Sequence, residues 1–220
     1  MGENALPVIQ QAFGCAPSLA LVIDERAHYK QYQPREKLIA SGETVRNAFL
    51  IVAGRAHEMA LSLDGRQILV QEFGVGDLFG EAAILGEHSA SEEIIAIHLT
   101  EAGQFRAGDL VGLIENYSCV ALAFSKLITQ KLRQTRRRLV EGATLSASGR
   151  IHSELLRQAR ASADNIITPA PVLSEFALLV QSTRETVSRT ISQLEKRGII
   201  KRDGKTLEVV APHRLEELIY

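Results

Sequence analysis

The sequence predicts an α+β protein with an N-terminal antiparallel β-roll, a long helix and a C-terminal winged helix-turn-helix. Three observations predict this fold class. Short apolar runs broken by glycines fill the first half, a proline-free segment runs from Asp109 to about Leu145, and two short helical patterns with a final hairpin end the chain. The corresponding domains are residues 1–109, 110–145 and 149–220.

Composition places the chain among ordinary globular proteins. Of its 220 residues, 45% are apolar and 23% are charged, and the mean hydropathy is +0.01. No segment approaches the roughly 20 apolar residues that a membrane helix needs. The segment Met1–Gln10 lacks the basic start and the apolar run of a signal peptide. We therefore expect a cytoplasmic protein without a membrane partner.

The net charge of −1 conceals an acidic half and a basic half. Residues 1–115 contain 8 Lys and Arg against 16 Asp and Glu, a net charge of −8, whereas residues 116–220 contain 17 against 10, a net charge of +7. A basic segment of this kind favours contact with nucleic acid, although a solvated charged face gives the same count.

Short strands are predicted throughout the first half, where apolar runs alternate with turn residues. Asp64-Gly65 is expected to join two of them, because a type I′ turn needs positive φ at both central residues. A compact antiparallel roll or sandwich is the natural packing for so many short strands. The predicted strands lie in Phe49–Gly54, Met59–Gly65, Gln67–Gly74, Glu93–His98 and Leu99–Phe105.

The proline-free segment carries one apolar stripe at spacings of three and four residues, the pattern of a long amphipathic helix. Basic residues, among them Lys126, Lys131 and Arg136, occupy the opposite face. The stripe packs either on the strands of its own chain or on the same helix of a second copy, and the pattern does not separate the two. The stripe, and with it the dimer interface of the second alternative, consists of Ala121, Phe124, Ile128, Leu132, Thr135 and Leu139.

The C-terminal segment begins at a predicted hinge, Ser146–Gly149, and continues as an amphipathic helix from Arg150 to about Ala161. Two further helices, Glu175–Val180 and Arg184–Arg197, have the spacing of a helix-turn-helix, and Ile199–Val210 reads as a hairpin about Asp203-Gly204. The predicted buried set of the helix-turn-helix is Ala177, Val180, Val187, Ile191 and Leu194.

The second of these helices carries side chains suited to DNA. In such a unit the helix enters the major groove by its N-terminal end, where Arg grips guanine O6 and N7 and Glu accepts from cytosine N4. Hydroxyl groups at the helix start and a basic hairpin, or wing, are placed for phosphates. The predicted base-reading residues are Arg184, Glu185, Ser188 and Arg189, and the predicted backbone contacts are Thr183, Thr186, Lys201, Arg202 and Lys205.

Residues Thr183–Arg189 and Leu194–Ile200 closely resemble the helix-turn-helix signature of the cyclic-AMP receptor protein/FNR (CRP/FNR) family of bacterial transcription regulators. The resemblance covers nearly the whole chain. Phe79–Leu85 resembles the family's phosphate-binding cassette, Gly42-Glu43 and Ala53-Gly54 resemble its β-roll turns, and Ser148–Ile151 resembles the junction before its DNA-binding domain.

The resemblance implies a β-roll like a cyclic-nucleotide-binding domain, a dimerisation helix and a winged helix-turn-helix. It implies a homodimer on a near-palindromic operator, with double-stranded DNA, a second copy of the chain and RNA polymerase as partners. One departure lies in the turn of the helix-turn-helix, where the family often has Gly and this chain has Gln181. If that residue takes positive φ, Gln costs about 1 kcal/mol there.

The resemblance breaks at the effector pocket. In members that bind cyclic AMP, an Arg-Ser or Arg-Thr pair downstream of the cassette neutralises the cyclic phosphate, but here those positions read Ser91-Glu92. No Lys or Arg occurs between Arg66 and Arg106. A phosphate would lose a charge-assisted pair worth about 1.5–3 kcal/mol and would meet Glu92 and Glu93 instead. We therefore expect no cofactor and no cyclic AMP bound in the usual way, and the effector is unknown.

On the long helix, Thr135 matches the family's adenine-contacting Thr, and Arg136 stands where a Ser usually follows. Arg136 either supplies the missing positive charge or pairs with a carboxylate and fills the pocket, with Glu81, Glu92 and Glu93 as candidates. We favour a self-filled or differently specific pocket. The predicted pocket residues are Gly80, Glu81, Ala82, Ser91, Glu92, Thr135 and Arg136.

Other classes of function have less support from the residues. Cys15 and Cys119 are too few for an iron–sulfur cluster, and the six His show no zinc-ligand spacing. A haem or thiol sensor stays an alternative, as does a small-molecule sensor that acts through a protein partner. No Ser/His/Asp, Cys/His or phosphate-loop arrangement is present, so an enzyme is not expected.

Overall fold

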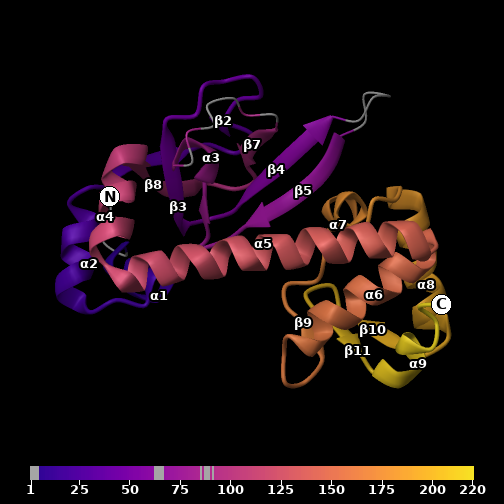
Figure 1. Ribbon diagram of the computed structural model, residues 1–220. Coiled ribbons are helices and arrows are strands. Elements are labelled where there is room, and N and C mark those ends of the chain that lie inside the picture. The colour runs from indigo at the N-terminus through magenta and orange to yellow at the C-terminus, as the bar shows by residue number, and fades with distance from the viewer. Residues whose placement is uncertain (1–4, 62–66, 85, 87–89, 91) are drawn as a thin grey trace. The chain divides into compact units, whose positions relative to one another are not determined.

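The computed structural model describes residues 5–61, 67–84, 86, 90 and 92–220. It divides into two compact units, residues 1–133 and 134–220, and the division falls within the long helix α5 (Ser118–Thr144) (Figure 1). No single helix in the described ranges is long and apolar enough to cross a membrane. Two bent helix pairs, Ala5–Phe13 with Pro17–Asp24 and Ala107–Asn116 with Ser118–Thr144, meet the length and composition criteria only as pairs.

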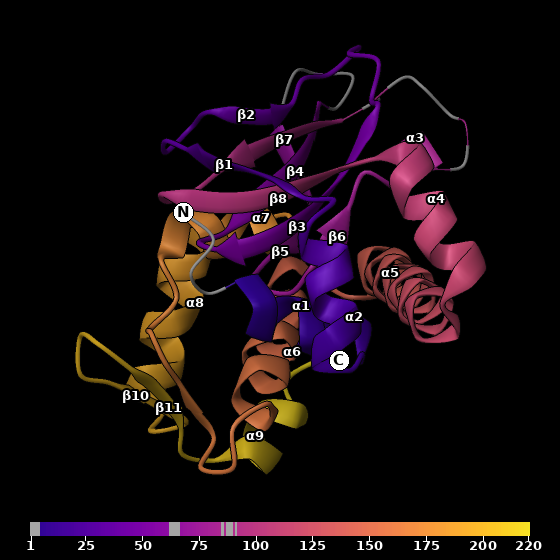
Figure 2. The same ribbon diagram turned by 90° about the vertical axis from the view of Figure 1, so that its left-hand side faces the viewer.

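The first unit contains two four-stranded antiparallel sheets, one facing the other (Figure 2). One sheet has the order β1-β8-β3-β6 and the other the order β2-β7-β4-β5. Because every pairing in both sheets is antiparallel, the fold is the β-roll that the sequence predicts. The strands are β1 (His28–Tyr32), β2 (Lys37–Ile39), β3 (Asn47–Ala53), β4 (Ala56–Leu61), β5 (Gln67–Phe73), β6 (Leu78–Phe79), β7 (Glu93–Ala96) and β8 (Thr100–Arg106).

Strand β3 is apolar without alternation because both of its faces are buried. Phe49 and Ile51 point into the core between the two sheets, whereas Ala48, Leu50 and Val52 point into a second core under the helices. The side chains of successive strand residues lie on opposite faces, so one short run supplies both cores. The predicted strand at Phe49–Gly54 is thereby confirmed.

Four helices cover the outer face of the β3 sheet and share its second core with Val120 of α5. The helices α1 and α2 precede the first strand and were not predicted, although Pro17 at the first turn of α2 is a helix-start signal. The small helix α3 follows β6. These helices are α1 (Ala5–Phe13), α2 (Pro17–Asp24), α3 (Glu81–Ile84) and α4 (Ala107–Asn116).

The predicted single helix from 110 to 145 is wrong in one respect: it is two helices, α4 and α5, bent by 114°. Tyr117 between them is extended, with φ −130° and ψ 107°. The Asn116 side chain donates to the Gly112 carbonyl at 2.7 Å and so competes with continuation of the helix. The break lets Leu110, Leu113 and Val120 all reach the same core.

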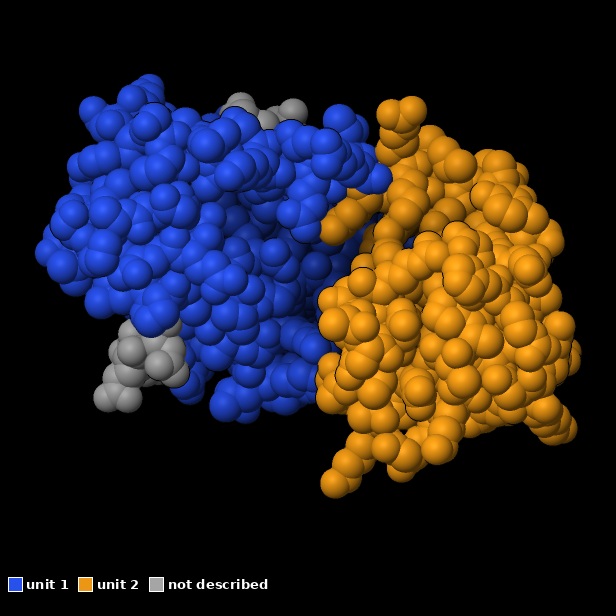
Figure 3. Space-filling view, turned by 90° about the horizontal axis from the view of Figure 1, so that it is seen from below, with its two compact units in different colours: residues 1–133 blue, residues 134–220 orange. Residues whose placement is uncertain are grey.

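The second unit, orange in Figure 3, packs one apolar core between four helices and a three-stranded sheet of order β10-β11-β9. All five predicted core residues of the helix-turn-helix are buried there. The hairpin at Ile199–Val210 is confirmed as β10 paired with β11. The elements are α6 (Ala147–Arg160), β9 (Ile166–Ile167), α7 (Leu173–Leu179), α8 (Arg184–Lys196), β10 (Ile200–Arg202), β11 (Leu207–Val209) and α9 (Pro212–Glu216).

The predicted hinge is a tight, capped junction. Two residues separate the end of α5 from the start of α6. One of them, Ser146, is the N-cap of α6, and its hydroxyl accepts from the Gly149 amide at 3.0 Å. A Cβ on Gly149 would lie 2.4 Å from the Ile219 carbonyl oxygen, so only Gly fits where the C-terminal segment crosses α6. The predicted turn at Asp64-Gly65 lies outside the described residues, while β4 and β5 on either side of it pair antiparallel.

Candidate nucleic-acid interface and effector pocket

Helix α8 has one buried apolar side and one exposed side, which is charged in its N-terminal half. Val187, Ile191 and Leu194 are 0 to 2% exposed, so the helix is anchored by its apolar side. On the other side Arg184, Glu185 and Arg189 are exposed, while Thr186 and Ser188 are half-buried. The structure therefore brings the predicted base-reading side chains together on the solvent side of one helix. Arg184, Glu185, Ser188 and Arg189 are spaced by one, three and four residues, which places them on adjoining turns of the helix.

The start of α8 is capped by a pair of threonines. Thr183 is the N-cap, and its hydroxyl oxygen accepts from the Thr186 amide at 3.2 Å. The two hydroxyl oxygens lie 3.0 Å apart. The two hydroxyl groups therefore bond to each other and, through Thr183, to the Glu185 carboxylate, and they hold the first turn of α8 in place.

Glu185 is held as a carboxylate at this helix start. Its own backbone amide lowers the pKa of the side chain most, followed by the Thr183 hydroxyl and the positive charge of Arg184. An ionised carboxylate only accepts hydrogen bonds. Glu185 therefore suits a donor such as the cytosine amino group.

The wing contributes two kinds of basic side chain. Lys201 and Lys205 are exposed on the hairpin. Arg202, predicted to lie along the DNA backbone with them, pairs with Glu195 of α8, with Nε to Oε1 at 2.8 Å and Nη2 to Oε2 at 2.7 Å. This bidentate pair raises the pKa of Arg202 and lowers that of Glu195. Arg202 thus joins the wing to α8.

The cassette between β6 and α3 follows the family pattern in its backbone. Gly80 has φ +84°, and a Cβ there would lie 2.7 Å from the Asn47 carbonyl oxygen of β3. Only Gly allows the chain to turn this closely over the sheet. Glu81 and Ala82 follow in the first turn of α3, both half-buried.

Lys131 of α5 occupies the position opposite Glu81. Its ammonium lies 2.6 Å from Glu81 Oε1, and the two side chains are 14% and 27% exposed. The same nitrogen lies 5.1 Å from the centre of the Phe73 ring, and its charge also acts on Asp77, whose pKa burial raises. The sequence did not predict Lys131 as a partner of Glu81.

The remaining predicted pocket residues are less closely assembled. Glu92 is half-buried, and Ser91 lies outside the described residues. Glu93 pairs with Lys37 at 2.6 Å. Thr135 and Arg136 are exposed and belong to the second unit. Lys131 could have been found from its spacing, because it continues the row Val120, Phe124, Leu127 that packs on the first unit.

The two cysteines lie near each other in the first unit. Both are half-buried and free, and both pack against the core beneath the helices. Burial raises the pKa of Cys15, and the neighbouring Cys119 raises it further. A raised pKa reduces the thiolate that oxidants attack.

Comparison with known proteins matches both parts of this structure. Residues 29–117 match the model of the cyclic nucleotide-binding domain, and residues 149–218 match that of the Crp-like helix-turn-helix domain. The cyclic AMP receptor protein of Thermus thermophilus is 28% identical over 210 residues, covering 94% of this chain and 95% of that protein. The cAMP-activated global transcriptional regulator Vfr of Pseudomonas aeruginosa is 24% identical over 191 residues, covering 83% of this chain and 89% of that protein.

Among solved structures, FixK2 from Bradyrhizobium japonicum superposes with a TM-score of 0.76 at 22% identity, covering 88% of this chain and 98% of that one. A cyclic-nucleotide-type β-roll followed by a long helix and a winged helix-turn-helix defines a class of DNA-binding transcription regulators. The chain belongs to the CRP/FNR family of that class.

Replacing Gln181 by Gly should stabilise the second unit. Gln181 has φ +51° in the turn between α7 and α8, a conformation that favours Gly. We expect Gln181→Gly to raise the free energy of unfolding by about 1 kcal/mol, measured by urea denaturation. Gln181→Ala keeps the Cβ and serves as the control without the gain. A less stable Gly variant would show that the glutamine side chain contributes more than its strain costs.

Proposed function

We propose that the protein is a homodimeric regulator that reads a near-palindromic DNA site through α8 and does so without cyclic AMP. The observation that carries this proposal is the two-sided character of α8: Arg184, Glu185 and Arg189 are exposed on a helix whose other face is fully buried. A rigidly seated helix with such an N-terminal half can enter a major groove without rearrangement.

The proposed contacts divide into base reading and backbone positioning. Arg184 and Arg189 would each bind guanine O6 and N7, and Glu185 would accept from a cytosine amino group, with Ser188 between them. Phosphates would bind at the positive N-terminal end of α8, beside Thr183 and Thr186, and at the exposed wing lysines 201 and 205. Arg202 would act by holding the wing against α8.

The proposed dimer forms through α5. This helix has 27 residues, and Val120 is the one that is buried within a single chain. Of the predicted stripe, Phe124 packs on the first unit's own core, whereas Leu132 and Leu139 are 67% and 73% exposed. The helix thus has one face for its own β-roll and another whose apolar side chains lack cover. Two copies related by a two-fold axis would read half-sites about 34–36 Å apart.

In this proposal residues 1–109 form the effector-type domain, residues 110–145 join the two subunits and residues 149–220 bind DNA. The protein would work in the cytoplasm, with RNA polymerase as a further partner.

The effector pocket is proposed to be filled from within. The carboxylate of Glu81, which would hold the ribose of a cyclic nucleotide, is bound to Lys131 at 2.6 Å. The segment between Arg66 and Arg106 supplies no cation for a cyclic phosphate. Lys131 therefore satisfies the cassette carboxylate in the absence of a ligand, and a nucleotide would have to displace it.

The first experiment is selection of duplexes from a random pool by the purified, ligand-free protein, followed by sequencing. The wild type should enrich one two-fold symmetric site, and Arg184→Ala or Arg189→Ala should relax one base pair in each half-site at a cost of about 1–3 kcal/mol. Arg214→Ala on α9, an exposed arginine away from α8, is the matched control. Uniform weakening on all sequences would show phosphate contacts only, and failure of the wild type to enrich any site would contradict effector-free recognition.

Charging the exposed stripe of α5 should separate the subunits. Leu139→Asp places a carboxylate where the two copies would pack, so the mass by light scattering should fall from dimer to monomer and operator affinity should fall with it. Leu21→Asp changes a leucine that is 52% exposed on α2 and is the matched control. A dimer that survives Leu139→Asp and Leu132→Asp would place the interface elsewhere.

Removing the cassette cation should destabilise the first unit. Lys131→Met leaves the Glu81 carboxylate without its partner, and we expect a loss of about 1–3 kcal/mol in unfolding free energy, largely recovered by adding Glu81→Gln. Lys126→Met, an exposed lysine of the same helix, is the control. Micromolar binding of cyclic AMP or cyclic GMP to the wild type in a calorimetric titration would refute the self-filled pocket.

A further inference from the structure

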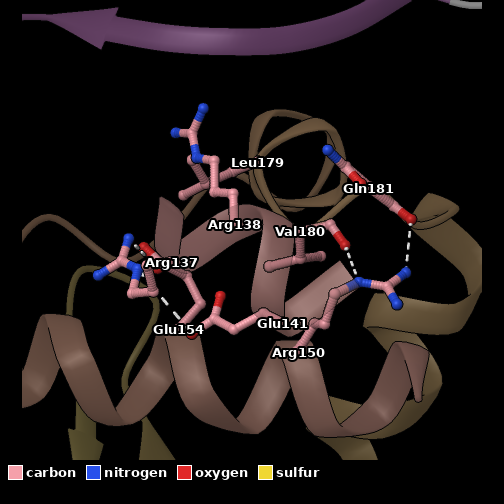
Figure 4. Close-up of a pocket in the computed structure, with 8 residues that line it drawn as sticks. All are labelled: Arg137, Arg138, Glu141, Arg150, Glu154, Leu179, Val180 and Gln181. Atoms are coloured by element: carbon pink, nitrogen blue, oxygen red, sulfur yellow. Dashed lines mark hydrogen bonds and ion pairs between the residues drawn. The ribbon is translucent and has the colours of Figure 1, made fainter. Parts of the chain in front are cut away.

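Arg150, in the first turn of α6, donates hydrogen bonds to three backbone carbonyls from two other parts of the second unit. Its Nε reaches the Val180 oxygen at 2.9 Å and its Nη2 the Gln181 oxygen at 2.9 Å (Figure 4). Its Nη1 reaches the Leu145 oxygen at 3.0 Å. Each acceptor is main chain, so the contacts depend on the path of the backbone and not on neighbouring side chains.

The first two acceptors belong to the turn of the helix-turn-helix. At the end of α7 the Gln181 amide donates to Leu178 at 3.2 Å and the Ser182 amide to Ala177 at 2.9 Å, with Gln181 at positive φ between them. This is the Schellman arrangement, which satisfies carbonyls of the last helical turn from within. The carbonyls of Val180 and Gln181 lie beyond its reach, and Arg150 supplies their donors.

The direction of α8 is set in this short stretch. A single residue separates Gln181 from Thr183, the N-cap of α8. Gln181 is a strained choice at positive φ, since no glycine makes the conformation easy there. The guanidinium group bonds two successive carbonyls at once and so opposes relaxation of the strained residue.

The third acceptor, the Leu145 carbonyl, lies at the C-terminal end of α5. Leu145 directly follows α5, and its amide closes the last turn of that helix on Glu141 at 2.9 Å. A second contact, from the Ser153 hydroxyl to Glu141 Oε1 at 2.9 Å, also joins α6 to α5. Through one side chain the C-terminal end of α5 is therefore bonded to the turn that directs α8.

We propose that Arg150 is a positioning residue for DNA recognition, which fixes the direction of α8 by clamping the α7–α8 turn to the end of α5. The inference rests on the proposed function of α8. Arg150 touches no DNA in this role: it acts through Val180 and Gln181 on the placement of Arg184 and Glu185.

The test uses Arg150→Lys in the full-length protein, with Arg160→Lys as the matched control. Lysine keeps the positive charge and loses the fork. Arg160 lies on the same helix, is 52% exposed in its side chain and pairs with Glu216. Three quantities are measured: affinity for the site selected by the wild type, affinity for an unrelated duplex at low salt, and the thermal unfolding midpoint.

For Arg150→Lys we expect operator affinity to fall about tenfold or more, because charge-assisted bonds to two turn carbonyls are lost. Affinity for the unrelated duplex should change less than about twofold, since it depends on net charge. Hydrogen exchange at the Gln181, Ser182 and Thr186 amides should rise in the free protein. Arg160→Lys should leave all of these unchanged.

Rescue distinguishes positioning from general stability. Gln181→Gly removes the strain at positive φ, so the double variant Arg150→Lys, Gln181→Gly should regain most of the operator affinity. Unchanged operator affinity in Arg150→Lys would overturn the proposal. So would a parallel loss of operator affinity, non-specific affinity and unfolding midpoint without rescue.

The wild-type selection is completed first, so the two failures are distinguishable. A wild type that prefers no duplex contradicts the proposed function and removes this role of Arg150 with it. A wild type that selects a site, with an unaffected Arg150→Lys variant, contradicts the positioning role alone.

Discussion

The backbone turn at Gln181 is the constraint on which the functional surface of this protein depends. The chain leaves α7 through one residue at φ +51° and reaches Thr183, the N-cap of α8, two residues later, so the direction of α8 is decided within a few bonds. The buried residues Val187, Ile191 and Leu194 then seat α8 on the core and leave its charged face to solvent. Arg150 bonds the outer carbonyls of the turn, and Arg202 bonds the wing to the far end of α8. A surface that reads DNA by geometry needs this rigidity, because base contacts depend on sub-ångström placement.

The first unit uses its charges differently. Its net acidity appears at the cassette, where Glu81 and Asp77 lie near one cation, Lys131, supplied by α5. The ion pair is largely removed from water, so its partners depend on one another: a half-buried carboxylate without a counter-ion is costly. In this chain the Lys131 ammonium occupies the position beside the cassette carboxylate. The backbone turn at Gly80 needs no ligand, so the fold keeps its form with this side chain in place.

Helix α5 carries two sets of apolar side chains in different surroundings. Its early residues Val120 and Phe124 pack on the β-roll, and Lys131 continues that face to the cassette. Its later leucines, Leu132 and Leu139, lie on another face and stay exposed in a single chain. One helix thus carries two apolar stripes. The 3.6-residue period of the sequence indicates which residues share a face of the helix, but not what that face packs against.

The sequence by itself determined the order and kind of most elements: the β-roll strands, the helix-turn-helix with its five buried residues, the wing, and the family. These follow from local rules, since strand alternation, helical periodicity and turn residues act over a few positions along the chain. The residues of the charged face of α8 were also predictable, because their spacing alone places them together.

Tertiary structure decided which distant groups meet. Four features depend on how the elements pack against one another: the break at Tyr117, the Lys131–Glu81 pair, the Arg202–Glu195 pair and the three carbonyls bonded by Arg150. Long side chains such as Lys and Arg reach several positions from one Cα, so periodicity assigns them a face of a helix but not a partner. The partner is chosen by where the chain brings the acceptor, and that is set only when both cores are packed.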